Sequence, residues 1–496
     1  MKIKREHWIA AALCAAVLLS MLLFFELAHP LVILDADDWT YISESRAALP
    51  SGRFWNPARV LPEILMPWSA GLGVMLFGGL GYIRAITLMN GLVLSLFITG
   101  YVLAFYRLLA ARLALERGKA ALLAALFLLL HFTLLRTQTA GNRHLFWAKD
   151  VCCVYYYVIP ALLNCTLVME LARSGLHRRI WEAGELWRKS LLIAAAYLAV
   201  FSNLFESAIL ACWCALELLT ALFRLRREKT PPRQLLREQS FSLAVALLWL
   251  LSAWFESRGG RGAAAAALPL GQALGRSAAA ALDFFRSFYA LALLPILGSL
   301  LFAAILRPWR KAAERKGLLR ELLLPLLAMG LLLALFQVLL CARVEPSYAG
   351  RSDVQFGACF VLLALAGLCL GLLLLRLEKL TLLLPLLLLV LFSVTSTRLR
   401  TFSESNDILA PASLCTAMDQ DLVDQVLEAQ ARGERSLTLH VAVWEAEDNW
   451  PQSRYMGGRL AASLYKHGVT EELMEIEILP DPEVNERFHL PLPGQA

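Results

Sequence analysis

Charged residues are scarce in this sequence, and the motifs of several enzyme classes are missing. Only 18% of the 496 residues are charged, whereas 58% are hydrophobic, and the mean hydropathy is +0.59. Soluble domains carry about a quarter charged residues, so this composition excludes an ordinary soluble protein. The sequence also lacks a glycine-rich phosphate loop, an HExxH motif and a nucleophile elbow. These absences argue against P-loop enzymes, zincins and α/β-hydrolases.

The ten cysteines lack the CxxC spacing and the histidine partners of a metal site. Most of them lie inside apolar runs. Cys152 and Cys153 are adjacent, and neighbouring residues rarely meet disulfide geometry. We therefore expect packed thiols and no metal site built from cysteine.

Long apolar runs are what the sequence has in abundance. Residues 318–340, for example, are apolar apart from Arg320, Glu321 and Gln337, and they approach the roughly 20 apolar residues that a helix needs to cross about 30 Å of hydrocarbon. The pattern predicts an all-α polytopic membrane protein with about eleven transmembrane helices. We expect them at residues 8–28, 84–106, 120–135, 155–172, 190–204, 207–223, 239–255, 287–306, 320–341, 355–375 and 380–396.

The distribution of Lys and Arg predicts the orientation. With the N-terminus inside, the inner segments hold 26 basic residues, whereas the outer loops before the tail hold 13. Cytoplasmic loops collect Lys and Arg, so this arrangement is favoured, and the basic residues need no nucleic acid to explain them. An odd number of spans places the C-terminus outside. We expect residues 60–81, and with less support 256–285, to lie at the outer surface without crossing.

The chain divides in charge at about residue 396. Residues 397–496 contain 8 Lys and Arg against 17 Asp and Glu, which leaves 39 against 23 for the rest. We expect a transmembrane domain over 1–396, with a first outer loop at 29–83, and a small extracytoplasmic α/β domain over 397–496. Apolar periodicity within the tail predicts helices at 416–431 and 451–467 and strands at 436–444 and 473–479.

The densest polar cluster directly follows the first span. Asp35, Asp37 and Asp38 lie within four residues, and Arg53 follows in the same loop. Crowded carboxylates repel one another, which raises the pKa of one of them or recruits a divalent cation. We take Asp37 and Asp38 as candidate catalytic residues exposed in a loop, with a divalent cation as a conceivable cofactor.

An acidic pair in the first outer loop, a surface helix after it and an outer C-terminal domain resemble the GT-C superfamily of glycosyltransferases. Asp37 and Asp38 match the acidic pair, and the likeness covers the first 65 residues and the overall topology. It is strongest to bacterial glucosyltransferase-like members that modify surface polysaccharide. The resemblance implies a polyprenyl-phosphate-linked sugar donor, a glycan or lipid acceptor and a bacterial cytoplasmic membrane location. It also implies that a first-loop acid activates the acceptor hydroxyl or helps to position a metal.

Leaving-group stabilisation in such a transfer needs positive charge at the lipid phosphate, and the outer loops supply it. Glu206 lies at the short outer turn between two predicted spans, and an ionisable residue at such a position is a functional candidate. The candidate substrate-binding residues are Arg59, Glu63, Arg143, His144, Lys149, Glu206 and Arg351. We expect six residues to converge on one outward-facing cavity that the tail partly covers: Asp37, Asp38, Arg59, Arg143, Glu206 and Arg351.

Two other functions stay open. A transporter or flippase of envelope lipid or saccharide would carry charges in the middle of its spans and discontinuous helices. Charges inside the predicted spans are almost absent, which favours the enzyme. A non-catalytic assembly protein would use the acidic tail to dock envelope partners.

Overall fold

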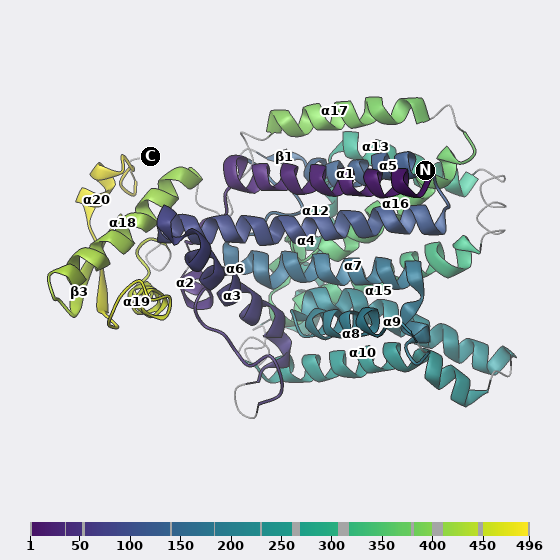
Figure 1. The fold of residues 1–496 in the computed structure, drawn as a ribbon, viewed down its shortest axis with the longest axis horizontal. Helices are drawn as coiled ribbons and strands as arrows, with labels where there is room; N and C mark the ends of the chain where they lie inside the picture. The colour runs from purple at the N-terminus through teal and green to yellow at the C-terminus, as the bar shows by residue number, and fades with distance from the viewer. Residues whose placement is uncertain are drawn as a thin grey trace.

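The computed structural model describes residues 2–34, 36–51, 55–138, 141–182, 184–228, 231–259, 268–305, 317–377, 381–398, 410–444 and 450–494. Most long helices run roughly side by side in one array (Figure 1), with the N-terminus at one end and the tail elements at the other. The long helices are α1 (Lys2–Leu23), α3 (Val60–Phe77), α4 (Tyr82–Arg112), α5 (Arg117–Thr133), α7 (Ile159–Ser174), α8 (Leu186–Val200), α9 (Leu204–Glu228), α10 (Pro232–Arg258), α12 (Leu270–Arg286), α13 (Ala290–Ile305), α15 (Leu324–Val344), α16 (Phe356–Leu374) and α17 (Leu383–Arg398).

Short elements join these helices. They are the π-helical turns η1 (Phe24–Ala28), η5 (Val154–Val158) and η7 (Leu319–Leu323), the 3-10 turns η3 (Pro57–Arg59), η4 (Gly78–Leu80), η6 (Leu176–Arg179) and η8 (Pro346–Gly350), the short helices α2 (Ala36–Tyr41) and α6 (Val151–Cys153), and the antiparallel pair β1 (Thr137–Gln138) and β2 (Gly141–Asn142).

Eight of the described helical segments are long and apolar enough to cross a membrane, which identifies a helical membrane-type protein. They are His7–Ala28, Pro57–Leu80, Tyr82–Arg112, Val151–Ser174, Leu204–Arg226, Pro232–Arg258, Leu319–Val344 and Phe356–Leu374. Seven of them coincide with predicted spans. The other four predicted spans form the shorter helices α5, α8, α13 and α17, of 15 to 17 residues.

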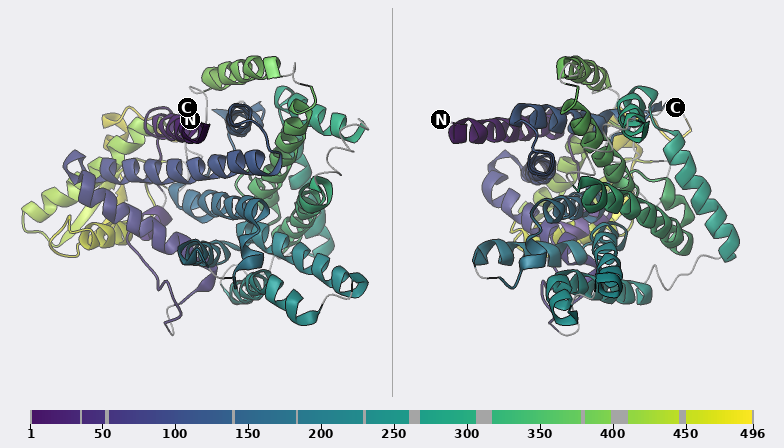
Figure 2. Two further views of the ribbon diagram at one scale, coloured as in Figure 1. Left: turned by 45° about the vertical axis from the view of Figure 1, so that its right-hand side comes forward. Right: turned by 90° about the vertical axis from the view of Figure 1, so that its right-hand side faces the viewer.

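Apolar side chains on the outside of the array support contact with lipid. Leu331, Leu335 and Leu339 recur every fourth residue on α15 and are exposed. On α17, Leu386 and Leu389 are also exposed, and this helix lies at the periphery of every view (Figure 2), packed against α5. An apolar surface of this extent is rare on soluble monomers, because water would drive it together.

Helix α3 is the segment that we expected to lie at the outer surface. It is helical, but its length and composition do not separate it from the spans. Figures 1 and 2 show it inclined to the neighbouring helices, close to α2 and the tail. At Gly73 it crosses α4 so closely that a Cβ atom would lie 2.7 Å from the carbonyl oxygen of Ala85. Glycine is therefore needed at this crossing.

The described part of the tail contains α18 (Ala412–Ala431), β3 (Ser436–Val441), α19 (Met456–Lys466), β4 (Glu475–Pro480) and α20 (Pro482–Arg487). Strands β3 and β4 pair in parallel, with α19 as the crossover between them. Gly433 and Gly468 adopt positive φ where α18 and α19 end, which allows each helix to stop there. Helix α18 begins four residues earlier than expected, directly after Pro411.

This unit docks onto the end of the helical array. Helix α19 packs on α2, where the Ser463 hydroxyl bonds to the carbonyl oxygen of Trp39 and, at 2.9 Å, to the Ser43 hydroxyl. His467, just after α19, lies 2.8 Å from the hydroxyl of Tyr82 at the start of α4. These contacts join residues about 400 positions apart, so the tail becomes part of the surface around α2 and the start of α4.

Candidate functional site

A cavity of about 380 Å³ opens among the helix ends on the tail side of the array. It lies between α2, η3, α6 with η5, the turn from α8 to α9, the end of α10, and the segment from α15 to η8. The charged groups of its wall are the cations Arg59, Lys149, Arg343 and Arg351 and the carboxylates Asp37, Asp150 and Glu256. Tyrosines 41, 156, 157 and 348 supply much of the remaining surface. Segments from six parts of the chain thus meet at one concave site.

Asp150 and the π-helical turn η5 set the aromatic wall of this cavity. The Asp150 carboxylate caps α6 by accepting a 2.5 Å hydrogen bond from the backbone N–H of Cys153. The wider turn of η5 then separates three consecutive tyrosines. Tyr156 and Tyr157 line the cavity, whereas Tyr155 points away to bond with Ser69 and Asn90. Single π-helical turns are frequent at functional sites because they redirect side chains in this way.

The two candidate catalytic carboxylates have different environments. Asp37 lines the cavity, its side chain is 53% exposed, and its Oδ1 lies 2.8 Å from an Nη1 of Arg459 on α19. Asp38 is fully buried, contrary to our expectation of an exposed loop carboxylate. Its Oδ2 accepts from the Leu34 N–H at 3.1 Å and its Oδ1 from the Cys152 N–H at 2.6 Å. This geometry suits Asp37 to contact a substrate and Asp38 to hold the loop against α6.

Arg351 is held rigidly at the wall. Its Nε and Nη2 bond to the two carboxylate oxygens of Asp353 at 3.0 and 2.5 Å, and Nη2 lies 3.4 Å from the Cys153 sulfur. The guanidinium also lies about 5 Å from the ring centres of Tyr157 and Tyr348. Burial alone would lower the pKa of Arg351, but the adjacent Asp353 carboxylate raises it, so the group stays charged.

Two other cations of the cavity differ from Arg351 in their contacts. Lys149 and Arg343 form no hydrogen bond or ion pair with any other residue that the structure describes. Arg59 faces Glu256 at 3.6 Å, a loose pair in which both side chains are partly exposed. A bound anion could therefore collect contacts from Lys149 and Arg343 without breaking an existing ion pair.

Glu63 and Glu206 lie behind the wall. Glu63 accepts a 3.1 Å hydrogen bond from the hydroxyl of Tyr156 and pairs with Arg46 at 2.7 Å, so it supports a cavity tyrosine. Glu206 follows the wall residues Asn203–Phe205 by one position and is fully buried. Neither of its carboxylate oxygens has a hydrogen-bond partner among the described residues. A buried acid in this state is unusual and invites a functional explanation.

Of the six residues expected to converge, Asp37, Arg59 and Arg351 line the cavity, whereas Asp38, Arg143 and Glu206 do not. His144 does not line it either. The Arg143 guanidinium lies 4.1 Å from the ring centre of Trp147. His144 is buried against Phe24 and His29, with ring centres 5.2 and 5.0 Å away. Burial, together with His29, holds the pKa of His144 well below its usual range, which leaves the ring neutral and unsuited to bind phosphate.

The structure describes only part of the acidic cluster. Asp35 and Arg53 lie outside the described residues, and Asp37 and Asp38 bond to different partners. Among the described residues there is no group of three or more His, Cys, Asp or Glu side chains arranged to hold a metal ion. All ten cysteines are free thiols.

Sequence reasoning did not single out Asp150, Glu256, Arg343 or Arg459. A polar residue directly before an apolar run is an N-cap signal, and this could have identified Asp150. Nothing local to Arg459 indicates that it meets Asp37, which lies 422 residues away. Comparison of the chain with family models, with curated proteins and with solved structures finds no match.

Proposed function

We propose that the protein is a membrane glycosyltransferase that moves a sugar from a polyprenyl phosphate to an acceptor hydroxyl in this cavity. The observation that carries the proposal is the content of one cavity: a half-exposed carboxylate, Asp37, beside the unpartnered cations Lys149 and Arg343. A group that takes a proton and groups that bind a departing phosphate are the two requirements of such a transfer.

In the proposed reaction the acceptor oxygen attacks the anomeric carbon of the sugar. Its proton passes to the Asp37 carboxylate, while the bond from the anomeric carbon to the phosphate oxygen breaks and its electron pair leaves with the lipid phosphate. Lys149, Arg343 and Arg351 stabilise the charge on that phosphate. Tyr156 and Tyr157 offer ring surfaces to the sugar. Asp38 and Asp150 position these groups by holding the backbone of α6.

The proposal includes an orientation. The N-terminus lies at the end of the array away from the cavity and the tail (Figure 1). Eleven crossings, with α3 at the outer surface and α5, α8, α13 and α17 as short spans, put the cavity and the tail outside the cytoplasmic membrane of a bacterium. The excess of Lys and Arg in the segments at the opposite end supports this orientation. Acceptors would then be envelope glycans or lipids.

The test is sugar transfer from a polyprenyl-phosphate sugar by the purified chain in proteoliposomes. Replacing Asp37 with Asn keeps the size of the side chain and removes the proton acceptor, so transfer should fall by about 10²–10⁴-fold. Asp283→Asn is the matched control, because Asp283 is an exposed acid that pairs with Arg286 and does not line the cavity. Equal transfer by Asp37→Asn, Asp283→Asn and the wild type would exclude Asp37 as the base.

A transporter of envelope lipid or saccharide is the second candidate, and Glu206 is the observation that favours it. An unpartnered buried acid in the first turn of a spanning helix is typical of ion-coupled transport. This function predicts substrate movement across the proteoliposome membrane without sugar transfer. Loss of that movement in Glu206→Gln, with no transfer by the wild type, would place the transporter ahead.

A further inference from the structure

A second cavity lies at the opposite end of the array, among the helix ends on the N-terminal side. Its volume is about 480 Å³, and it lies between η6, the second half of α9, the start of α10 and the segment from η7 to α15. Its wall includes three arginines, Arg178, Arg224 and Arg320, and two carboxylates, Glu217 and Glu321. The proposed transfer reaction uses none of these residues.

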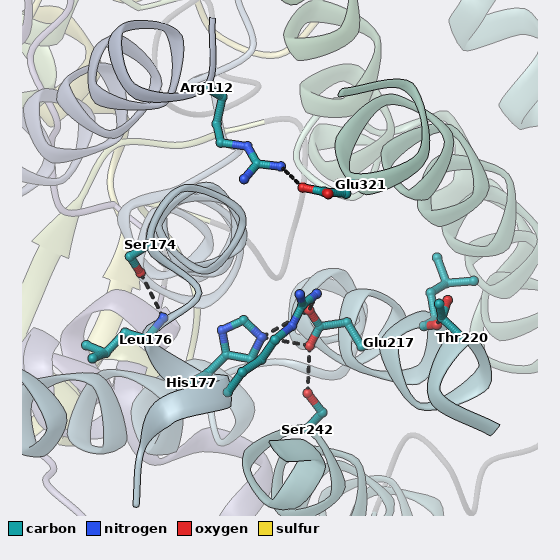
Figure 3. A network of polar contacts seen from close by, with 10 residues as sticks. Arg112, Ser174, Leu176, His177, Glu217, Thr220, Ser242 and Glu321 are labelled. Atoms are coloured by element: carbon teal, nitrogen blue, oxygen red, sulfur yellow. Dashed lines mark hydrogen bonds and ion pairs between the residues drawn. The ribbon is translucent and has the colours of Figure 1, made fainter. Parts of the chain in front are cut away.

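Both carboxylates of this cavity are already neutralised by protein groups. Glu217 is buried and accepts hydrogen bonds from Arg178 at 2.8 Å, from His177 at 2.9 Å and from Ser242 at 2.8 Å. Figure 3 shows His177 and Ser242 approaching Glu217 from neighbouring elements, with Arg112 directed at Glu321. The Arg112 to Glu321 distance is 2.8 Å. Neither carboxylate is therefore available to the remaining two arginines.

Arg224 and Arg320 form no hydrogen bond or ion pair with any other described residue, although both line the cavity. Two buried polar groups of the same wall also lack partners: the indole N–H of Trp213 and the side-chain carbonyl oxygen of Gln239. Buried polar atoms are nearly always hydrogen-bonded, so unpartnered ones beside a cavity indicate a polar ligand. Two free guanidinium groups indicate that the ligand is an anion, and guanidinium geometry matches phosphate.

The rest of the wall is apolar. Leu216 and Ala221 of α9 and Leu324, Pro325 and Ala328 of α15 lie next to the arginines. Both helices belong to segments long and apolar enough to cross a membrane, so this apolar wall continues toward the lipid. We propose that this cavity binds the phosphate group of an anionic membrane lipid from the leaflet on the N-terminal side, with the lipid chains along α9 and α15.

A soluble phosphate compound shares the charge of this ligand but leaves the apolar wall unused. The proposal therefore commits to the lipid, and it does not depend on the transferase activity. Its test measures binding by the full chain, stripped of lipid in detergent, with native mass spectrometry. The probes are phosphatidylglycerol, diacylglycerol, which has the chains without the phosphate, and inorganic phosphate as a soluble competitor.

We expect phosphatidylglycerol to bind, diacylglycerol to bind much more weakly, and millimolar inorganic phosphate not to displace the lipid. Arg224→Ala and Arg320→Ala should each weaken binding about fivefold, and the double variant about 25-fold. Arg188→Ala is the matched control, because Arg188 is an exposed arginine near the same end that pairs with Glu185 outside the cavity. Arg224→Lys/Arg320→Lys should fall between the wild type and the double alanine variant.

Three results would overturn the proposal. The first is equal lipid binding by the double alanine variant, by Arg188→Ala and by the wild type, with unchanged thermal midpoints. The second is equal binding of diacylglycerol and phosphatidylglycerol, which would show that the chains alone are recognised. The third is displacement of the lipid by inorganic phosphate, which would assign the cavity to a soluble phosphate compound. Each of these measurements is independent of sugar transfer. A negative result for lipid binding would therefore not contradict the proposed transferase function.

Discussion

Replacing Asp38 with Asn should destabilise the protein, whereas the same change at Asp37 should not. The Asp38 carboxylate is fully buried and accepts from two backbone N–H groups, those of Leu34 and Cys152. Asparagine keeps one carbonyl oxygen and places an NH₂ group where the other oxygen was. One buried backbone N–H therefore faces a donor, and the link between the first outer loop and α6 is weakened.

The size of the effect follows from these contacts. A hydrogen bond to a charged group contributes about 1.5–3 kcal/mol, and a buried donor left unsatisfied costs about 1–3 kcal/mol. Removing a buried charge relieves some desolvation, which offsets part of this loss. We therefore expect Asp38→Asn to cost about 2–3 kcal/mol. The pair of Asp37 with Arg459 is largely exposed, and such pairs contribute about 0.2–1 kcal/mol.

The assay is the thermal midpoint of the detergent-solubilised chain, followed by the loss of monodisperse protein on heating. Asp38→Asn should lower the midpoint by several degrees, and Asp38→Ala should lower it further because both hydrogen bonds are lost. Asp37→Asn should lie close to the wild type. If Asp38→Asn melts with the wild type while sugar transfer is abolished, the buried contacts are not supporting the fold and Asp38 takes part in the chemistry.

Three further predictions concern orientation, the phosphate contact and pH. A reporter that is active only outside the cytoplasm should be active when fused after Ala496 and silent when fused after Glu228; the reverse pattern would contradict the orientation. Arg351→Lys should raise KM for the polyprenyl-phosphate sugar about tenfold with a smaller change in kcat, because one ammonium cannot reproduce the paired contacts with Asp353. The control is Arg276→Lys, at an exposed position outside the cavity. An unchanged KM in both variants would show that Arg351 does not belong to the site. Burial raises the pKa of Asp419 well above its usual range, so the folded tail binds this proton more tightly than the unfolded chain does. The contribution of Asp419 to stability is therefore greatest below about pH 4 and is lost as the pH rises through the pKa that Asp419 has in the folded state. In the full chain, Asp419→Asn should therefore slow hydrogen exchange of β3 at pH 8 but not near pH 4, and equal exchange by the variant and the wild type at pH 8 would refute this.

The positions of most helices could be read from the sequence because lipid imposes a simple requirement. A spanning helix needs about 20 apolar residues, and seven predicted spans coincide with helices of sufficient length and composition. The tail elements were equally readable, since glycines end α18 and α19 at Gly433 and Gly468. Length and composition could not decide the placement of α3, because its apolar content equals that of a span while Gly73 serves close packing on α4.

The site was only partly predictable, because adjacent residues of a helix point about 100° apart. Asp37 and Asp38 therefore read as an equivalent pair in the sequence, although one faces the cavity and the other accepts from a backbone 114 residues away. The loop from residue 141 to residue 150 gave the same difficulty. Lys149 lines the cavity, but His144 packs among aromatic rings, because its loop turns inward between β2 and α6.

The partners of the carboxylates explain why we propose Asp37, and not its neighbours, as the base. Asp38 and Asp150 hold the backbone of α6, and Asp353 fixes Arg351, so each has a structural task within the helical array. Among the contacts that the structure describes, Asp37 is the one of these four that pairs with the tail, through Arg459, and the side chains of Asp37 and Arg459 are 53% and 35% exposed. An exposed pair of this kind contributes little energy, so a substrate hydroxyl can replace Arg459 at Asp37 without disturbing the packing of the spans. Arg459 is thus a direct contact between the tail and the proposed base, and changes in the docking of α19 on α2 should alter the environment of Asp37.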